Sequence, residues 1–459
     1  MKKLLFIFLL FPLLSTAQNI TGTIVSQLSN LPIDNTNVSA LSSKSGTISN
    51  DKGVFSIYIL PKFKDDEILE FSHLGYITQK LSINSLKKND FKVVLEEEIQ
   101  NLSDVTIAPN QKLKTKLAFS EISTLKNPIY SFGSFFNEGK IYISGGDGYE
   151  DIDKMAKVRA EKAVPTMGDF LDASQTSVKR HYKKYLSIYD IKTNSWEYPE
   201  LKLQGRAYHN IHFYNNLIYV LGGKKMFVNK ISSWEYLQDQ IEVLDLDKLS
   251  IKIDKTNPHQ AADFASFTYN DNIIVLGGSV KMTESGKKVF TNKVHLYNIT
   301  SGYWYELNSM PTAKETTGIL IDNKIYLIGG NNGKAISQIE SYDLLTEKWK
   351  TEGELFSPIE RPAITFHENM IYFFEDGKMC TYDLKTKLLK EYEIDLGLKY
   401  AAMYYDNDKL YILGGRIDNS YSKIPSAKVL SIDIHEFKTT KPNRTKFLSQ
   451  DGNLAKVNQ

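Results

Sequence analysis

The chain has 459 residues, of which 42% are hydrophobic and 24% charged, and this is enough to form more than one hydrophobic core. Lysine and arginine number 56 against 54 for aspartate and glutamate, so the formal charge of +2 excludes overall charge as a basis for binding nucleic acid or an acidic membrane. The sequence predicts two or three domains and no nucleic-acid partner.

The first 17 residues have the features of a secretory signal peptide. Lys2 and Lys3 precede the apolar run 4–14, and small residues at 15–17 provide a cleavage point before Gln18. No other stretch approaches the 18 apolar residues that a membrane-spanning helix needs. We expect an exported protein whose mature chain has no transmembrane segment.

Residues 18–100 alternate short apolar strands with turns and predict a small β-sandwich. Asp51 and Gly53 in the turn NDKG (50–53) tolerate the backbone angles of a hairpin. The segments TISNDKGVF (47–55) and FSHLGY (71–76) resemble the carboxypeptidase-regulatory-like domain. That domain often precedes TonB-dependent transporters, so the resemblance implies the envelope of a Gram-negative cell, in the periplasm or at the outer membrane. Residues 101–116 are polar and indicate a linker.

The rest of the chain repeats one unit six times. Each repeat has an 18-residue segment that contains a hairpin, and five of the six segments end in Gly-Gly, as KIYLIGG (324–330) does. The segments are 129–146, 206–223, 261–278, 313–330, 359–376 and 398–415. A third strand ending in Asp or Asn and a fourth strand follow each hairpin, and the fourth carries Trp196, Trp304 and Trp349 in three repeats. Four strands per repeat predict an all-β, six-bladed β-propeller over 117–440.

The doublet, the Tyr-Asp pair and the tryptophan resemble the kelch family, most clearly in IYLIGG and SYDLLTEKW between residues 325 and 349. Kelch propellers include protein-interaction modules, copper enzymes similar to galactose oxidase and a periplasmic sialic acid mutarotase. We expect the Trp and Tyr side chains to pack between neighbouring blades, and residues 117–125 to supply the outer strand of the last blade. We expect residues 441–459 to form a polar tail without order.

The family architecture places the second and third residues of the six segments in a ring around the mouth of the central channel. Together with Arg206 and His209, the ring offers acids, bases and tyrosines that are suited to a carboxylated or hydroxyl-rich ligand. An alternative is that these charges only pair with one another. The predicted ligand-binding residues are Arg206, Tyr208, His209, Asp263, Lys314, Glu315, Glu360, Arg361, Lys399 and Tyr400.

The first repeat carries an insertion, residues 147–184, which is far longer than a hairpin loop. Ile152, Met155 and Arg159 fall at helical spacing within it, so we expect part of it to be an amphipathic helix. An ordered insertion would favour a lid over a small ligand, and a mobile one would favour a protein or polymer partner.

No metal or cofactor site is predicted. His209 and His212 are three apart on a strand and therefore point to opposite faces, which argues against copper. No His/Cys cluster has zinc spacing. Cys380, the single cysteine, cannot form an intramolecular disulfide, and we expect it to be a small buried hydrophobe.

The sequence predicts an exported binding or scaffold protein of the cell envelope, non-catalytic and linked to glycan uptake. Its partner is a small acidic or neutral glycan, or an envelope protein. The alternative is a periplasmic sugar-acid epimerase or mutarotase of the sialic acid type that uses acids and arginines of the ring, although no catalytic residue can be assigned.

Overall fold

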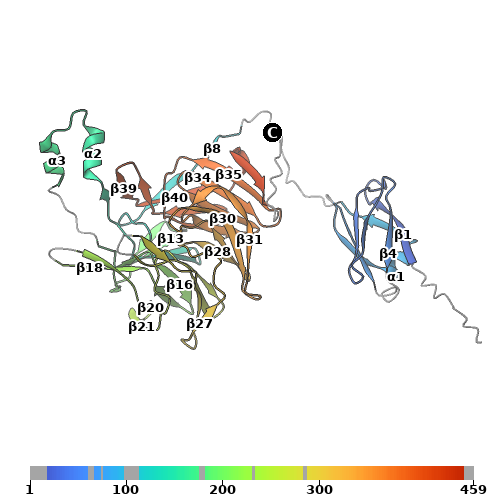
Figure 1. Cartoon of the computed structure of the whole chain (residues 1–459), viewed down its shortest axis with the longest axis horizontal. Helices are drawn as coiled ribbons and strands as arrows, with labels where there is room; N and C mark the ends of the chain where they lie inside the picture. Colours follow the sequence, from blue (N-terminus) through green and yellow to red (C-terminus); the bar gives the residue numbers. More distant parts are fainter. Residues whose placement is uncertain are drawn as a thin grey trace, which may run out of the picture. The chain divides into compact units, whose positions relative to one another are not determined.

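The computed structural model describes residues 18–59, 67–73, 76–97, 113–174, 181–229, 233–282 and 287–448. The chain divides into two compact units, Met1–Gln111 and Lys112–Gln459, and each is described by itself (Figure 1). The predicted signal peptide and residues 101–112 of the predicted linker lie outside the described residues. Within the described ranges, no helix is both long and apolar enough to cross a membrane.

The first unit is a β-sandwich of two sheets. One sheet has the order β4-β1-β7 and the other β3-β2-β5-β6. The strands are β1 (Gln18–Ser26), β2 (Asn37–Ala40), β3 (Gly46–Ile48), β4 (Val54–Ile59), β5 (Ile68–Ser72), β6 (Gln79–Ser82) and β7 (Lys92–Leu95).

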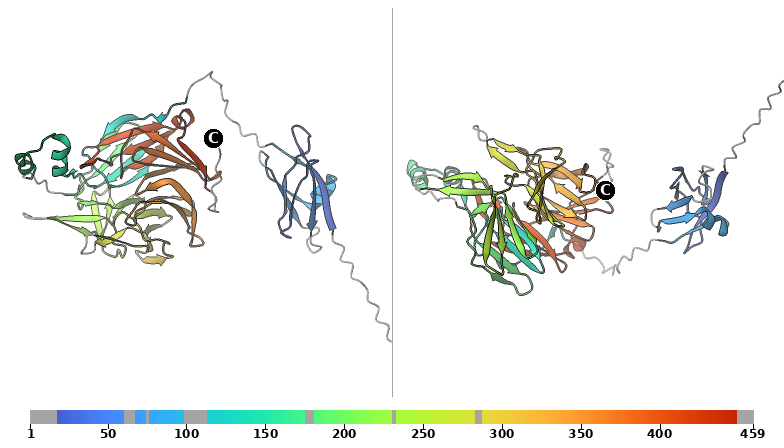
Figure 2. Two further views of the ribbon diagram at one scale, coloured as in Figure 1. Left: turned by 45° about the horizontal axis from the view of Figure 1, so that its top comes forward. Right: turned by 90° about the horizontal axis from the view of Figure 1, so that it is seen from below.

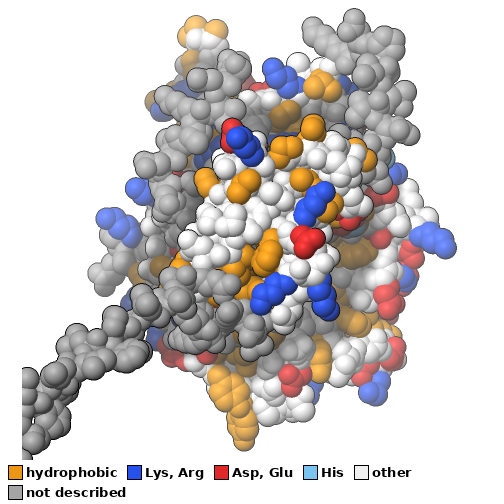
Figure 3. All heavy atoms as spheres, turned by 90° about the vertical axis from the view of Figure 1, so that its right-hand side faces the viewer, with side chains coloured by type: hydrophobic (Ala, Val, Ile, Leu, Met, Phe, Trp, Pro, Cys, Tyr) orange, Lys and Arg blue, Asp and Glu red, His pale blue; other side chains and the backbone are white. Residues whose placement is uncertain are grey.

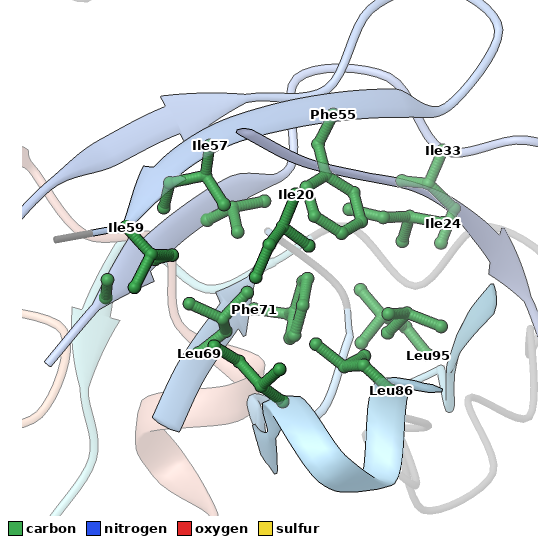
Figure 4. Packing of buried hydrophobic residues seen from close by; sticks show 14 residues of the cluster. Ile20, Ile24, Ile33, Phe55, Ile57, Ile59, Leu69, Phe71, Leu86 and Leu95 are labelled. Atoms are coloured by element: carbon green, nitrogen blue, oxygen red, sulfur yellow. The ribbon is translucent and has the colours of Figure 1, made fainter. Parts of the chain in front are cut away.

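The core of this unit follows from the period of two along its strands. In β4, the side chains of Phe55, Ile57 and Ile59 are buried while those between them are exposed. Figure 4 shows these residues meeting Leu69 and Phe71 from the facing sheet. The sandwich prediction is confirmed.

The strand pattern missed one helix in this unit, α1 (Ile83–Lys88). The hydroxyl of Ser82 caps it by accepting a hydrogen bond from the backbone amide of Ser85, at 3.2 Å. Ile83 and Leu86 close the core from this side. A single turn and a half of helix is too short for the apolar period to distinguish it from a strand.

Apolar side chains also remain on the surface of the first unit. Leu28 and Leu31, between β1 and β2, are 80% and 65% exposed. Figure 3 shows hydrophobic side chains interspersed with charged ones over one face of the molecule. Single exposed apolar residues are normal on a folded surface, so we assign these no binding role.

The second unit is a propeller of six antiparallel sheets, which are its blades. Their innermost strands lie next to one another in chain order. From the inside out, blade 1 contains β10 (Gly133–Asn137), β11 (Lys140–Ser144), β13 (Leu186–Asp190) and β14 (Ser195–Glu197). Blade 2 contains β16 (Asn210–Tyr214), β17 (Leu217–Leu221), β20 (Ile241–Asp245) and β21 (Ser250–Asp254). Blade 3 contains β22 (Ala265–Tyr269), β23 (Asn272–Leu276), β26 (Val294–Asn298) and β27 (Trp304–Leu307).

Blades 4 and 5 contain β28 (Gly318–Ile321), β29 (Lys324–Ile328), β30 (Ile336–Asp343) and β31 (Lys348–Ile359), and then β32 (Ala363–His367), β33 (Met370–Glu375), β34 (Lys378–Asp383) and β35 (Leu388–Ile394). Blade 6 contains β36 (Ala402–Asp406), β37 (Lys409–Leu413), β40 (Lys428–Asp433) and β9 (Ser120–Thr124). Figure 2 gives two further views of the blades.

The outermost strand of blade 6 comes from the beginning of the unit. Strand β9 pairs antiparallel with β40, so the expected closing strand within residues 117–125 is confirmed. Blades 6 and 1 then share one core, and the Tyr404 hydroxyl donates to Ser134 Oγ across their boundary at 2.6 Å. Pairing strands from both ends of the unit joins the first and last blades.

Both ends of the unit also attach to blade 5. Strand β8 (Lys116–Leu117) runs parallel to β35, and β41 (Arg444–Phe447) pairs antiparallel with it. The expectation of an unordered tail from residue 441 is therefore wrong for residues 441–448, because their backbone extends a sheet. Residues 449–459 lie outside the described residues.

The Gly-Gly doublets lie where each blade meets the next. The amide of the second glycine donates to a carbonyl at the start of the next repeat segment, as Gly330 does to Ile359 at 3.0 Å. A Cβ on Gly329 would stand 2.6 Å from the same Ile359 oxygen, and the residue has φ +68°. At Gly329 a side chain would clash with the Ile359 carbonyl and would have to adopt a left-handed conformation, so glycine is favoured at this position.

The tyrosine and tryptophan of the repeat pack as expected. Tyr342 stacks on Trp349 with ring centroids 4.6 Å apart, and Trp349 Nε1 donates to the Asn308 carbonyl of blade 3. In blade 1, Trp196 Nε1 donates to Ser123 Oγ of β9, in blade 6, at 3.0 Å. The aromatic pairs therefore join neighbouring blades, and they are structural.

Replacing Gly329 with alanine tests the doublet. We expect the propeller to lose about 3 kcal/mol of unfolding free energy, because a left-handed residue costs about 1–2 kcal/mol and the clash with the Ile359 carbonyl adds about 1–3 kcal/mol. Gly302→Ala is the matched control, since Gly302 has φ +74° and nothing within 4 Å of the added Cβ. Equal losses for both variants in urea titrations would show that the blade contact does not demand glycine.

Candidate functional site

One face of the propeller carries the connections that follow the second strand of each blade. Those of blades 2, 3 and 6 form extra hairpins, namely β18 (Lys224–Val228) with β19 (Ser233–Leu237), β24 (Ser279–Met282) with β25 (Lys288–Phe290), and β38 (Arg416–Asp418) with β39 (Ser422–Pro425). In blade 1 the insertion forms β12 (Asp151–Ile152), α2 (Lys154–Glu161) and α3 (Met167–Ser174). Figures 1 and 2 show α2, α3 and β18 projecting on the same side of the propeller.

The insertion contains the expected helical segment, but α2 and α3 have no buried residue. The insertion is joined to blade 6, where β12 pairs with β39 and the Tyr421 hydroxyl donates to Glu161 at 3.2 Å. The apolar stripe predicted on α2 therefore does not pack against the propeller. The helices stand away from the sheets (Figure 1).

The channel mouth is outlined by backbone hydrogen bonds that run from blade to blade. The amide of Tyr208 donates to the Ser131 carbonyl at 2.7 Å, and the amide of Asp263 donates to the Tyr208 carbonyl at 3.1 Å. Tyr400 and Thr316 extend this series on either side. Ser131, Tyr208, Asp263 and Tyr400 have φ between +49° and +61°, in the left-handed region that side chains disfavour. Such strain persists only where the surrounding structure enforces it.

Three contacts bring the acids and bases of the ring together at the mouth. Arg361 of blade 5 forms an ion pair with Asp263 of blade 3. The Tyr400 hydroxyl donates to Glu360 Oε2 at 2.8 Å. Lys288 on β25 reaches Glu315 Oε1 at 2.7 Å. Two ion pairs and one hydrogen bond thus link residues of four blades at the opening.

A cluster of tyrosines surrounds a buried carboxylate on the opposite side of the mouth. The hydroxyls of Tyr130 and Tyr208 both donate to Asp147 Oδ2, at 2.9 and 3.1 Å, and Asp147 is fully buried. The guanidinium of Arg416 lies over the rings of Tyr130 and Tyr400, 5.0 and 4.6 Å from their centroids. Cation–π contacts of this kind hold the rings in place.

A polar cavity of about 180 Å3 lies in the channel next to the mouth. Ser131, Arg361 and Tyr400 contribute to its lining at the mouth. Hydroxyl and amide groups of the innermost strands line it further along, from Ser134, Asn210, Ser266, Thr317 and Tyr404. The cavity therefore presents hydrogen-bonding groups from all six blades to one space.

Burial shifts the proton affinities of several groups at the mouth. Burial first, and then the neighbouring Asp263, raises the pKa of Glu315. Burial also raises the pKa of the Tyr400 hydroxyl, and Glu360 and Asp263 add to the effect. For Lys288 burial acts in the opposite direction, but Asp263 and Glu315 outweigh it and raise the pKa. A buried acid with a raised pKa beside a lysine is the kind of group that can take part in proton transfer.

The structure brings six of the predicted residues together, namely Tyr208, Asp263, Glu315, Glu360, Arg361 and Tyr400. Lys399 instead turns to Asp376, which lies 3.4 Å away. Three further residues predicted at the mouth are buried between or within blades, and their placement on the rim is wrong.

The first two of these three form buried ion pairs. Arg206 is 1% exposed and its Nη2 lies 2.6 Å from Glu242 Oε2. Lys314 is equally buried and pairs with Glu340. Both acids lie three residues before the Asp that ends the third strand, in blades 2 and 4. A buried charge requires a partner of opposite charge, and each of these two cations finds its partner inside its own blade.

The third, His209, is fully buried beside blade 1, where its ring lies against Gly133 and Gly145. Burial first, and then Arg206 and Arg361, lowers its pKa well below the ordinary value, so it is neutral. His212 bonds to Ser266 and Thr268 of blade 3, on the other side. The two histidines point to opposite faces, as expected.

Several groups at the mouth were not recognised in the sequence, among them Asp147, Tyr182, Lys224, Lys288 and Arg416. Asp147, Lys224 and Arg416 each directly follow a Gly-Gly doublet, and their backbones pair with the second residue of the same repeat segment. The position after the doublet was therefore an available signal. Lys288 and Tyr182 come from long connections, whose course no spacing predicts.

Cys380 is buried in the core of blades 4 and 5, as expected, and burial raises the pKa of its thiol. Its neutral sulfur serves as a small apolar group among Phe373 and Leu389.

Comparison with known proteins agrees with this architecture. The family model described as KLHDC2/KLHL20/DRC7 Kelch-repeats domain matches residues 173–377, and the CarboxypepD_reg-like domain matches residues 20–107. Kelch-like protein 41b of Danio rerio is 25% identical over 191 residues, which are 41% of this chain. TonB-dependent receptor P39 of Formosa agariphila is 32% identical over 94 residues, which are 20% of this chain.

The chain spans 29% of the length of Kelch-like protein 41b and 8% of the length of the receptor. A solved structure titled "Structure of YjhT" aligns with a TM-score of 0.48 and 13% identity, covering 68% of this chain and all of that one.

The buried pair of Arg206 and Glu242 makes a prediction about stability. Arg206→Ala leaves the Glu242 carboxylate buried without its partner, and we expect a loss of about 3–5 kcal/mol in the unfolding free energy of the propeller. The control Lys140→Ala breaks the more exposed pair with Glu197 and should cost less than about 1 kcal/mol.

In the double variant Arg206→Met/Glu242→Leu, most of the loss should be recovered, because both charges leave together. Urea titrations of the variants measure these differences. A loss for Arg206→Ala no larger than that for Lys140→Ala would contradict the structural role.

Proposed function

Since residues 173–377 are kelch repeats and residues 20–107 a carboxypeptidase-regulatory-like domain, we propose that this chain is a non-catalytic binding protein of the cell envelope that holds a hydroxyl-rich glycan at its channel mouth. The observation that carries the proposal is the polar cavity of about 180 Å3 beside Arg361 and Tyr400. Polar groups that converge on one concave site can orient a bound small molecule through hydrogen bonds. The signal-peptide pattern of residues 1–17 supports export, and the 94-residue similarity to a TonB-dependent receptor supports a place in the cell envelope.

The charges at the mouth favour a neutral glycan over an acidic one. Among the described residues, each lysine and arginine that we place there has a carboxylate partner: Lys224 with Glu235, Lys288 with Glu315, Arg361 with Asp263, and Arg416 with Asp418. A carboxylated ligand would have to displace a protein carboxylate, whereas sugar hydroxyls can donate to these acids and leave the pairs intact. The sequence left acidic and neutral glycans open.

Thermal-shift measurements test this proposal. We expect neutral mono- and disaccharides to raise the melting temperature by mass action, and uronic acids to raise it less. Tyr400→Phe, which removes one hydroxyl from the mouth, should weaken sugar binding by up to about tenfold, since a hydrogen bond between neutral groups contributes roughly 0.5–1.5 kcal/mol.

Tyr305→Phe is the matched control, because Tyr305 is 51% exposed on the outer strand of blade 3. The proposal fails if no sugar changes the melting temperature, or if Tyr400→Phe binds as the unchanged protein does.

Glu315 supports a second candidate, a sugar-acid epimerase or mutarotase of the sialic acid type. Its raised pKa and its contact with Lys288 are features of a general acid or base. If Glu315 acts as a base, exchange between the anomers of N-acetylneuraminic acid should slow as the pH falls through its pKa, because the protonated carboxyl no longer accepts a proton. Proton NMR of the exchange checks this, with Glu315→Gln expected to be inactive. An exchange rate equal to that of buffer alone would eliminate this candidate.

A further inference from the structure

The hairpin of β18 and β19 has two different faces. Its register pairs Phe227 with Trp234 and Lys225 with Tyr236, so these four side chains share one face. The intervening residues form the other face, on which Lys224 and Glu235 contact each other and the tyrosines of the mouth. The side of the hairpin that faces the mouth therefore makes charged contacts. We call the opposite side the aromatic face, and it consists of Lys225, Phe227, Trp234 and Tyr236.

The rings of the aromatic face are open to solvent. Phe227, Trp234 and Tyr236 are 56%, 46% and 54% exposed. Phe227 and Trp234 stack at a centroid distance of 5.9 Å with 29° between their planes. A shallow surface hollow is lined by Lys225, Phe227 and Tyr236 of this face and by Met226 of the other face. Exposing three large aromatic side chains to water on one short hairpin is unfavourable, and such exposed apolar surface points to a ligand.

The size of the aromatic face limits what can bind there. Five residues of strand extend about 17 Å and two strands are about 5 Å apart, so the face is far smaller than the roughly 800 Å2 per partner of a stable protein interface. It matches one or two sugar rings. The C–H face of a pyranose is apolar and slightly positive, and it complements the negative face of an aromatic ring.

Polar groups border the rings at the base of the hairpin. Lys225 Nζ lies 2.7 Å from Asp239 Oδ1, and both side chains remain more than a third exposed. Such a pair can accept and donate hydrogen bonds to sugar hydroxyls at the edge of a stacked ring. Aromatic faces next to a hydrated ion pair therefore suit a neutral pyranose better than a purely apolar partner.

We propose that the aromatic face of β18 and β19 is a second glycan-binding site, in which pyranose rings of an oligosaccharide stack on Phe227, Trp234 and Tyr236. The proposal rests on the proposed role in glycan binding but not on occupation of the mouth. Because the other face of the same hairpin contacts Tyr208 and Tyr182, a saccharide chain held here lies beside the opening.

Tryptophan fluorescence tests the proposal directly. Trp196, Trp304 and Trp349 each pack on a tyrosine of their own blade, so Trp234 is the exposed one of the four tryptophans in the chain. We expect titration with xylan, laminarin or maltohexaose to change the emission of Trp234, and this change to disappear in Trp234→Phe. Phe227→Ala and Tyr236→Ala retain the fluorophore and should each raise the apparent Kd at least about tenfold, the loss of one stacked aromatic.

Tyr303→Ala is the matched control, since Tyr303 is 67% exposed in blade 3, outside the hairpin, and should leave the titration unchanged. Native affinity electrophoresis in gels containing each polysaccharide provides a second readout that does not depend on fluorescence. No response to any of the three glycans by either method would overturn the site. Retardation that survives Phe227→Ala/Trp234→Ala but is lost in Tyr400→Phe would place the glycan in the mouth, and would overturn the aromatic face while leaving the proposed function intact.

Discussion

The structure of the propeller depends on one hydrogen bond repeated at every blade boundary. The amide at the end of each second strand donates to a carbonyl at the start of the next repeat segment, as Gly146 does to Arg206 and Gly415 to Ile129, both at 2.9 Å. The second of these bonds closes the circle between blades 6 and 1. The bond fixes how closely two blades approach, and at the doublets a Cβ on the first glycine would come within 2.5–3.0 Å of the accepting carbonyl.

Blade 5 shows which part of this contact is indispensable. It has Glu375 and Asp376 where the other blades have the doublet, yet Asp376 still donates its amide to the Leu398 carbonyl at 2.9 Å, with φ +49°. Glu375 is buried and accepts the backbone amides of Glu360 and Arg361, at 2.9 and 2.8 Å. The hydrogen bond between blades is retained while the glycine is not, and the carboxylate directs Glu360 and Arg361 to the mouth.

The geometry of the mouth follows from these hydrogen bonds between blades. The left-handed conformations of Tyr208, Asp263 and Tyr400 turn their side chains toward one opening, and the backbone bonds between neighbouring blades hold them there. Buried pairs such as Arg206 with Glu242 stiffen the blades behind the mouth and take no part in it. The rigid frame allows a polar site to be organised in advance, so that binding does not require the side chains to be ordered anew.

The sequence alone determined the architecture, because blade structure is local. The alternation of apolar and polar residues, the doublets and the Tyr-Asp pairs repeat within about fifty residues. Each of them indicates a hairpin that forms from segments close together in the chain. The closing strand within residues 117–125 was expected for a different reason, namely that many propellers combine strands from both ends of the chain in one blade.

Tertiary structure alone decided which polar residues share the site. Arg206 and Arg361 look equivalent as arginines near the start of a repeat, but one pairs with Glu242 inside its blade and the other reaches Asp263 two blades away. Strand β41, the ring of left-handed residues and the outward aromatic face of β18 and β19 likewise depend on contacts between distant segments. Repetition in sequence fixes what every blade has in common, whereas a binding site is built from the positions at which the blades differ, and those meet only when the circle closes.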